Sequence, residues 1–407
     1  MQQQQNFTRG YTLSKTILMA WELGNEIGHL SQFAEMAAVF KTQGHRVVIA
    51  LRDLSRTHFF FKQQGLPIIQ APVWLYPVQM QRPVFCMADI LMTKGYLYHT
   101  TLQNLVEAWQ ALLDLVQPDL VVSEYAPTLR LALRGGTTPD VIMGAGFAEP
   151  AAGQPMLDMR PRPEADGVVQ AQERNLLLTI NQVLDALGKP PLDRYSDLFQ
   201  PDLMVMKTLP ELDIYQRDAT AHYCLPVSRS RRPAAQWLDR PGKKVFVYGL
   251  PEHSQWSVLI DALKACNANV FLYSPGDRRQ RVKAHDEGSF RLGVDVVNVP
   301  ESLRQADLFV CHGDMHNLVQ AACVGVPVLS LPMNLEQLLN SLNYQALSAG
   351  VCLQKVASVA AGVQIINQML ADDGLTAAAQ RLAERAGDFD QIDAIEQVVE
   401  RCLGLLP

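Results

Sequence analysis

Short apolar runs alternate along the chain with longer stretches of helical periodicity. In the first half, the runs of strand length are residues 16–23, 45–51, 66–71, 119–123, 140–144 and 203–207. Residues 29–43, between the first two runs, repeat apolar side chains at helical spacing, and Gly44 follows where a C-cap glycine is typical. Strands that alternate with helices predict an α/β fold with a parallel sheet covered on both faces.

The pattern changes in the middle of the chain, and the changes predict its domain organisation. Residues 147–199 begin as a loop rich in Pro and Gly and continue into an amphipathic helix, which we interpret as an irregular wall over the strand ends. After a segment rich in Pro, Arg and Ser the alternation restarts, with strands expected at residues 245–249, 269–273, 294–299, 308–311 and 327–331. We therefore predict an N-terminal domain over residues 1–225, a linker over 226–243, and a C-terminal domain over 244–407 whose last helix can pack back on the first domain.

Residues 306–337 carry the densest candidate chemistry. An apolar strand runs directly into His312 and Gly313, a helix follows, and the next strand leads to Glu336 and Gln337. In open α/β sheets ligands bind at the carboxyl ends of strands, and a helix N-terminus there offers free N–H groups and a partial positive charge. The unit can therefore hold a diphosphate, with His312 as a further donor and the Glu-Gln pair for sugar hydroxyls.

At these residues the chain resembles the nucleotide-sugar-dependent glycosyltransferases of glycosyltransferase family 1. That family reads His-Gly-Gly-x-x-Thr-x-x-Glu-Ala-x-x-x-Gly-x-Pro, then Pro-x-x-x-(Asp/Glu)-Gln. The matching positions here are His312, Gly313, Asp314, Asn317, Gln320, Ala321, Gly325, Pro327, Pro332, Glu336 and Gln337. Upstream, Val299 begins the segment that matches the family's Val-Pro-Gln, which passes beside the base of the nucleotide. The resemblance implies the GT-B fold, two Rossmann-like doubly wound domains facing a cleft, with donor-binding residues at these positions.

Three positions depart from the family pattern. Asn317 stands for Thr, Gln320 for the Glu that usually holds the ribose, and Asp314 for the second Gly. Asp314 has two interpretations: a helix N-cap, for which Asp is preferred, or a carboxylate that faces the phosphates. In the second case, two charges about 4 Å apart would repel by about 4 kcal/mol at an effective dielectric of about 20, unless a protonated His316 pairs with the carboxylate.

The first half supplies candidates for acid–base chemistry. Gly28-His29 lies where the first strand leads into the first helix, and the resemblance implies that His29 is the general base on the acceptor hydroxyl. Glu124 ends the buried run 119–123, where many family members have an Asp that stabilises the imidazolium, and Glu26 is a weaker rival. A helix-start cap and a solvated carboxylate are the alternatives. The aromatic stretch 74–98 is interpreted either as an acceptor pocket or as core.

Composition excludes some classes of function. A net charge of −6, with 48% apolar and 19% charged residues, argues against nucleic-acid binding. Seven dispersed cysteines are typical of reduced thiols in the cytoplasm, and no apolar stretch reaches the length of a transmembrane segment. No metal-ligand cluster or triphosphate-binding loop is visible, so we expect no metal requirement and no cofactor beyond the nucleotide-sugar co-substrate.

The sequence thus predicts an inverting glycosyltransferase of the hexosyltransferase class. It would move a sugar from a nucleotide diphosphate sugar to a hydroxyl of a small-molecule or lipid acceptor, by metal-independent direct displacement with His29 as base. Two alternatives stay open. A non-catalytic GT-B binding or activator protein would explain the altered donor motif, and a nucleotide-sugar 2-epimerase would use the same fold.

Overall fold

The structure is a computed structural model that describes residues 14–24, 28–55, 57–61, 64–80, 82–217, 222–225, 232–249, 253–274, 290–293, 297–388 and 395–407. The side chains of residues 28, 29, 31, 58, 59, 290 and 388 lie outside this description. His29 is therefore placed only by its backbone, and Glu26 and most of the first half of the predicted linker are not placed.

The first sheet has seven parallel strands in the order β3-β2-β1-β4-β5-β6-β7. Its strands are β1 Thr16–Trp21, β2 Arg46–Leu51, β3 Ile68–Gln70, β4 Leu120–Glu124, β5 Asp140–Gly144, β6 Leu203–Met206 and β7 His222–Tyr223. The helices around it are α1 Gly28–Thr42, α2 Thr57–Phe60, α3 Met87–Leu91, α4 His99–Val116, α5 Pro127–Leu133 and α6 Val168–Ala186, with short turns η1 Met92–Tyr96, η2 Tyr195–Phe199 and η3 Pro210–Leu212.

The second sheet repeats this winding with six parallel strands in the order β10-β9-β8-β11-β12-β13. Its strands are β8 Lys244–Tyr248, β9 Asn269–Tyr273, β10 Phe290–Gly293, β11 Leu308–Cys311, β12 Val328–Ser330 and β13 Gly350–Cys352. Its helices are α7 Trp256–Ala265, α8 Val299–Leu303, α9 Met315–Val324, α10 Leu335–Ala346, α11 Val359–Leu370 and α12 Asp373–Asp388, and the chain ends with α13 Ile395–Leu403. The predicted α/β class with two doubly wound parallel sheets is confirmed.

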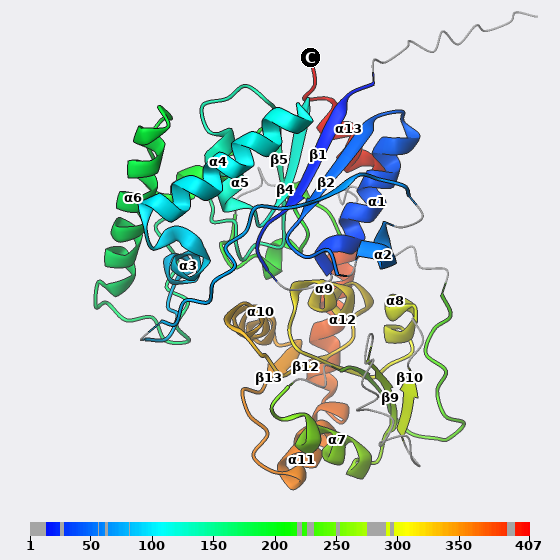
Figure 1. The fold of residues 1–407 in the computed structure, drawn as a ribbon. Helices are drawn as coiled ribbons and strands as arrows, with labels where there is room; N and C mark the ends of the chain where they lie inside the picture. The colour runs from blue at the N-terminus through cyan, green and yellow to red at the C-terminus, as the bar shows by residue number, and fades with distance from the viewer. Residues whose placement is uncertain are drawn as a thin grey trace, which may run out of the picture.

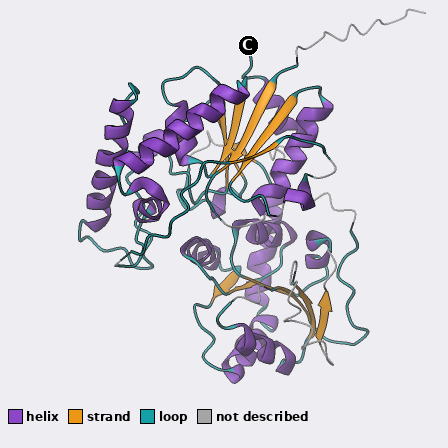
Figure 2. Cartoon of the chain, viewed as in Figure 1, coloured by secondary structure: helices purple, strands orange, loops and turns teal. Residues whose placement is uncertain are grey.

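Both faces of each sheet are buried, which explains the nearly continuous apolar runs. Along β1, Leu18 and Ala20 belong to one hydrophobic cluster, whereas Ile17 and Met19 belong to the cluster on the opposite face. The second sheet divides in the same way, because Phe246 of β8 lies in one cluster and its two neighbours lie in the other. A strand covered by helices on both sides has no solvent-facing positions, so period-two alternation is lost. Figure 2 shows helices flanking the strands of both lobes.

The two sheets form separate lobes, and the strands of the first point their carboxyl ends towards the second (Figure 1). The segment after β6 connects the lobes: Leu209 and Leu212 lie in a hydrophobic cluster of the second sheet, and the Thr208 hydroxyl is 3.1 Å from the Met315 sulfur of α9. The last helix, α13, returns to the first lobe, where it packs on α1 and buries Val398 in the cluster of the first sheet.

The end of one predicted strand is wrong. Residues 294–299 were expected as a strand; residues 294–296 lie outside the described residues, and Val299 begins helix α8. Asn298 caps this helix by accepting from the Glu301 N–H, and Pro300 occupies its first turn. An Asn cap followed by Pro is a typical helix start, and it prevails over the apolar run Val-Val-Asn-Val that suggested a strand.

Candidate functional site

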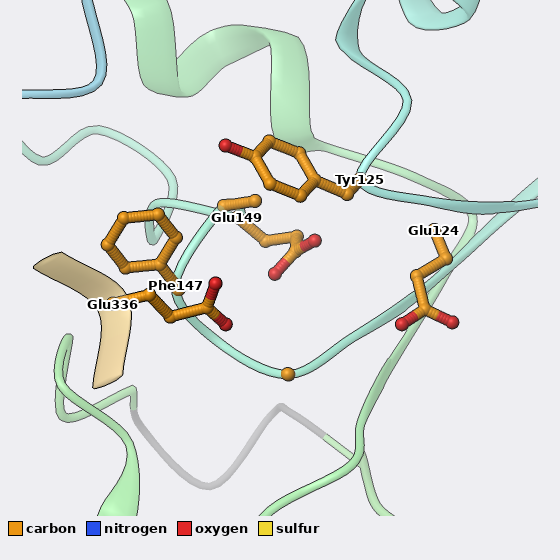
Figure 3. Close-up of a pocket in the computed structure, with 7 residues that line it drawn as sticks. Glu124, Tyr125, Phe147, Glu149 and Glu336 are labelled. Carbon is orange, nitrogen blue, oxygen red and sulfur yellow. The ribbon is translucent and has the colours of Figure 1, made fainter. Parts of the chain in front are cut away.

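A pocket lies between the lobes at the carboxyl ends of β4 and β5 (Figure 3). The first lobe contributes most of its lining and the second contributes Glu336 from the first turn of α10. The lining residues are Glu124, Tyr125, Ala145, Phe147, Ala148, Glu149 and Glu336. The free volume inside is about 10 Å³, room for about one water molecule. Side chains of both lobes therefore meet at one small cavity where parallel strands end, which is the usual ligand position in such sheets.

Glu124, predicted as the partner of the base, ends β4 with 1% of its surface exposed. Its carboxylate forms an ion pair with the ammonium of Lys207, which follows β6 and is itself buried. A buried carboxylate is stable only when a cation or several donors compensate its lost hydration. Lys207 supplies that compensation, and sequence reasoning missed it because the partners are 83 residues apart.

Glu149 is a second buried carboxylate, and it lines the pocket together with Glu336 (Figure 3). It accepts a hydrogen bond from the Gly146 N–H at 3.2 Å. Burial raises the pKa of Glu149, while the nearby Arg217 charge opposes the rise. Gly144 makes the packing possible, because a Cβ there would lie 2.3 Å from the Glu149 carboxyl carbon. The Gly144–Phe147 segment thus reaches the pocket, and the only sequence signal for Glu149 was that it follows this segment.

Tyr125 forms another wall of the pocket and has a left-handed backbone, with φ of 43°. Its carbonyl accepts from the Leu23 N–H at 2.9 Å, which ties the end of β4 to the end of β1. A non-glycine residue in this region costs on the order of 1 kcal/mol and persists only where the surroundings fix it. The strained backbone of Tyr125 therefore lies in the wall of the pocket.

Glu22, at the end of β1, is a buried carboxyl that the sequence did not single out. One of its oxygens accepts from the backbone N–H groups of Thr128 at 2.9 Å and Leu129 at 3.3 Å. Burial raises the pKa of Glu22 to about 7, although these hydrogen bonds act in the opposite direction. The residue caps the start of α5, a structural role that couples folding to pH.

Glu336 and Gln337 lie in the first turn of α10, whose N-cap is Asn334. The Asn334 carboxamide accepts from the Gln337 N–H at 2.9 Å, and the Gln337 side chain accepts from the Met333 N–H at 2.8 Å. Gln337 therefore closes the turn that starts the helix, whereas Glu336 reaches the pocket.

His312 follows β11 and is almost fully buried. Its Nδ1 lies 3.2 Å from the Leu331 carbonyl oxygen, and its ring stacks on His253 with centroids 5.6 Å apart and planes 27° apart. Burial lowers the pKa of His312 to about 4, and the neighbouring His253 adds to the effect. His312 is thus a neutral imidazole at neutral pH.

Gly313 has a conformation and a position that only glycine fits. Its φ is +84°, and a Cβ there would lie 2.0 Å from the Ser341 hydroxyl oxygen and 2.8 Å from the Gln337 carbonyl oxygen. The left-handed backbone and the close approach of α10 each exclude a side chain. The glycine therefore brings the start of α9 against α10.

Asp314 is the N-cap of α9. One carboxylate oxygen accepts from the Asn317 N–H at 3.0 Å, and the other accepts from the Asn317 side-chain amide at 2.7 Å. Of the two interpretations of Asp314, the structure shows the cap. His316 hydrogen-bonds the Gln320 amide at 2.6 Å. Positions 314 and 317 thus hydrogen-bond each other, whereas position 320 hydrogen-bonds His316.

The remaining predicted donor contacts lie apart from the pocket. Gln320 is 4% exposed, and its amide nitrogen contacts His316. Val299 is partly buried and packs on the hydrophobic cluster that contains Phe246 and Phe309. Of the aromatic stretch, Tyr96 is core, whereas Tyr76 and Tyr98 are largely exposed, and none of the three lines the pocket.

His29 is the second residue of α1, the element that follows β1 in the chain. The structure does not describe its side chain. Within the described ranges, no group of three His, Cys, Asp or Glu side chains could hold a metal ion. No helix in the part of the chain that the structure describes is long and apolar enough to cross a membrane.

Comparison with known proteins finds a family model that matches most of the second lobe. Residues 257–400 match the family described as Erythromycin biosynthesis protein CIII-like, C-terminal domain. A PGL/p-HBAD biosynthesis glycosyltransferase of Mycobacterium tuberculosis is 26% identical over 326 residues, which are 73% of this chain and 74% of the relative. A PGL/p-HBAD biosynthesis rhamnosyltransferase of Mycobacterium bovis is 27% identical over 348 residues, 78% of this chain and 74% of the relative.

Solved structures extend the likeness over both lobes. The glycotransferase of kitacinnamycin aligns with a TM-score of 0.70 and 15% identity, covering 97% of this chain and 100% of the other. The spinosyn rhamnosyltransferase SpnG in complex with thymidine diphosphate aligns with a TM-score of 0.66 and 17% identity, covering 95% and 99%. At such identities the alignments establish the GT-B fold. Together with the motif from His312 to Gln337 and the curated relatives, they indicate a nucleotide-sugar-dependent glycosyltransferase of the GT-B fold whose sequence resembles glycosyltransferase family 1.

Proposed function

We propose that the protein is an inverting transferase that moves a hexose or deoxyhexose from a nucleoside diphosphate to an acceptor hydroxyl. One observation carries the proposal: Glu336, from the helix that follows the donor motif, meets the ends of β4 and β5 in one pocket. The sugar would lie beside this pocket, between a nucleotide on the second lobe and an acceptor on the first. Names of two relatives, a rhamnosyltransferase and a transferase crystallised with thymidine diphosphate, suggest a thymidine diphosphate 6-deoxyhexose as first donor to test.

The donor site in this proposal is built from the second lobe. The diphosphate would lie near the start of α9, where Gly313 brings the backbone close and His312 offers a ring nitrogen. Glu336 would accept from sugar hydroxyls, and charge-assisted hydrogen bonds of this kind are about twice as strong as neutral ones. Val299, Asn317, Gln320 and Gln337 would complete the site, Gln337 by holding the α10 turn in place.

Transfer of the sugar requires that the acceptor hydroxyl lose its proton as its oxygen attacks the anomeric carbon. His29, at the start of α1, would take that proton, and Glu124 would stabilise the imidazolium that forms. A general base contributes about 10²–10⁴-fold to the rate. The departing diphosphate would be stabilised by His312 and the α9 N-terminus in place of a cation. Turnover should therefore persist in excess EDTA.

The decisive experiment combines donor titration with one substitution. Calorimetry with a panel of thymidine and uridine diphosphate sugars should reveal a ligand, and no binding to any would favour the non-catalytic alternative. His29→Ala should lower kcat at least about a hundredfold and leave donor affinity within about twofold, because a base acts only in the transition state. His99→Ala, at an exposed position in α4, is the matched control. Equal losses in kcat and donor affinity would remove His29 from the base role.

A further inference from the structure

Glu149 lines the interlobe pocket with a carboxylate oxygen that the protein leaves without a hydrogen bond. The residue is 2% exposed, and its Oε2 accepts from the Gly146 N–H at 3.2 Å. Its Oε1 accepts no hydrogen bond from the described residues, and it is not completely enclosed by them. Burying a carboxylate costs free energy unless hydrogen bonds or a cation replace its hydration. Glu149 therefore keeps an acceptor oxygen available at the pocket.

Two other buried carboxylates near Glu149 each have a cation bonded to them. Glu124 pairs with Lys207, and Asp213 pairs with Arg217. The charges of these two cations also act on Glu149, but both cations already form ion pairs elsewhere. Glu149 itself forms no ion pair with any described residue. A buried polar group that the protein leaves undercompensated at a pocket is typical of a side chain that binds a ligand.

Two glycines hold the Glu149 carboxylate in this position. A Cβ at Gly144 would lie 2.3 Å from the carboxyl carbon, so any side chain at position 144 would occupy the place of the carboxylate. Gly146 has a left-handed backbone, with φ of 101°, and presents the N–H that Glu149 accepts. The end of β5 is thus shaped to hold a carboxylate at the wall of the pocket.

The size of the pocket limits what can reach this oxygen. Its free volume of about 10 Å³ admits about one water-sized group, so a sugar ring is excluded and a single hydroxyl fits. Glu336, which lies in the sugar-binding part of the donor motif, lines the same pocket from the second lobe (Figure 3). A sugar held by Glu336 beside the pocket can therefore insert one hydroxyl that meets Glu149.

We propose that Glu149 is a specificity-determining residue that accepts a hydrogen bond from a hydroxyl of the donor sugar, so that both lobes hold the sugar. Glu149 takes one hydroxyl from the first lobe, and Glu336 takes a neighbouring hydroxyl from the second. The site thereby selects sugars with hydroxyls on adjacent carbons. The inference rests on the proposed function, since it requires the donor sugar to lie beside Glu336.

The test is calorimetry of the full chain with two ligand pairs: thymidine diphosphate with thymidine diphosphate rhamnose, and uridine diphosphate with uridine diphosphate glucose. Within a pair, the ratio of the two Kd values isolates the contribution of the sugar. Glu149→Ala should weaken binding of the sugar nucleotide at least about tenfold, the lower end for a hydrogen bond to a charged group, and leave the Kd of the nucleoside diphosphate within about twofold. Glu149→Gln keeps a neutral acceptor and should lose less. An unchanged ratio in both variants would overturn the proposal.

Two further variants separate a sugar contact from a structural role. Gly144→Ala keeps the carboxylate but displaces it, and should lower the same ratio. Glu164→Gln, at a side chain that is 67% exposed, is the matched control and should leave both Kd values unchanged. Thermal unfolding should show no loss of stability in Glu149→Gln, because the variant no longer buries an undercompensated charge. Lower stability together with equal losses for nucleotide and sugar nucleotide would mark a structural residue and overturn the proposal.

Failure of this inference is distinct from failure of the proposed function. If none of the four ligands binds the wild type, the proposed donor site itself fails. If the wild type binds a ligand pair and the Glu149 variants keep its Kd ratio, the donor site stands and only the sugar contact of Glu149 is refuted.

Discussion

Exchanging Asp314 for Asn removes one negative charge from the start of α9 and keeps a helix cap. The Asn side chain can still accept from the Asn317 N–H, and the Asn317 amide can rotate to accept from it, so both hydrogen bonds at 3.0 and 2.7 Å have replacements. The free energy of unfolding should therefore change by less than about 0.5 kcal/mol. Asp314→Ala loses the cap and should cost about 1 kcal/mol.

The effect on donor binding follows from the charge. If the nearest phosphate lies about 6 Å from the carboxylate, their repulsion is about 0.7 kcal/mol in water and about 3 kcal/mol at an effective dielectric of about 20. Removing it should tighten the binding of a nucleoside diphosphate between about threefold and about a hundredfold. The gain should shrink as salt is raised, because partly exposed charges are screened.

Calorimetry at 50 and 500 mM NaCl on the wild type, Asp314→Asn and Asp314→Ala measures this effect. Tighter binding in both variants, with stability lost only in Asp314→Ala, is the expected result. Asp314→Asn with unchanged affinity at low salt would refute the reasoning, because the diphosphate would then lie far from the start of α9. Weaker binding in Asp314→Asn would show that the carboxylate helps to hold the ligand.

Two further substitutions test the packing around the site. Glu22→Gln should remove a pH dependence of the free energy of unfolding. Because the pKa of Glu22 is raised, the folded state holds a proton between pH 4.5 and about 7 that the unfolded state has released. The free energy of unfolding of the wild type should therefore fall by up to about 3 kcal/mol as pH rises through this window. Urea unfolding at several pH values should show the Gln variant gaining on the wild type, and parallel profiles would contradict the role of Glu22. Gly313→Ala should cost about 2–4 kcal/mol by thermal unfolding, since the left-handed backbone and the contacts with Ser341 and Gln337 are both violated. Ser341→Ala, the control, should be nearly neutral, and a harmless Gly313→Ala would refute the close packing.

Much of the fold was predictable because buried parallel strands are recognisable as short apolar runs in the sequence. Residues 140–144 and 269–273 coincide with β5 and β9, and the helix expected at 29–43 is α1, displaced by one residue at each end. The wrong end of the strand predicted up to Val299 has a local cause too, because the Asn-Val-Pro start of α8 competes with an apolar run of strand-like composition. Patterns of this kind depend on near neighbours in sequence, which single-chain reasoning can see.

The candidate site was predictable only in part. The motif from His312 to Gln337 lies in one strand–helix–strand unit, so its order and spacing are visible in sequence, and comparison with known proteins supports the family it indicated. Whether Asp314 caps its helix or faces a ligand was open, because both roles suit an Asp at a helix start. The direction of its side chain was decided by where Asn317 offers its N–H and its amide.

The sequence by itself determined the two sheets, the order of their elements and the family motif, because hydrophobic periodicity and strand–turn–helix spacing are properties of short segments. Tertiary structure alone decided that Lys207 neutralises Glu124, that Glu149 and Glu336 line one pocket, and that His253 stacks on His312. These pairs join residues about 60 to 190 positions apart in the chain. Their energies come from burial and charge compensation in three dimensions, which no local pattern records.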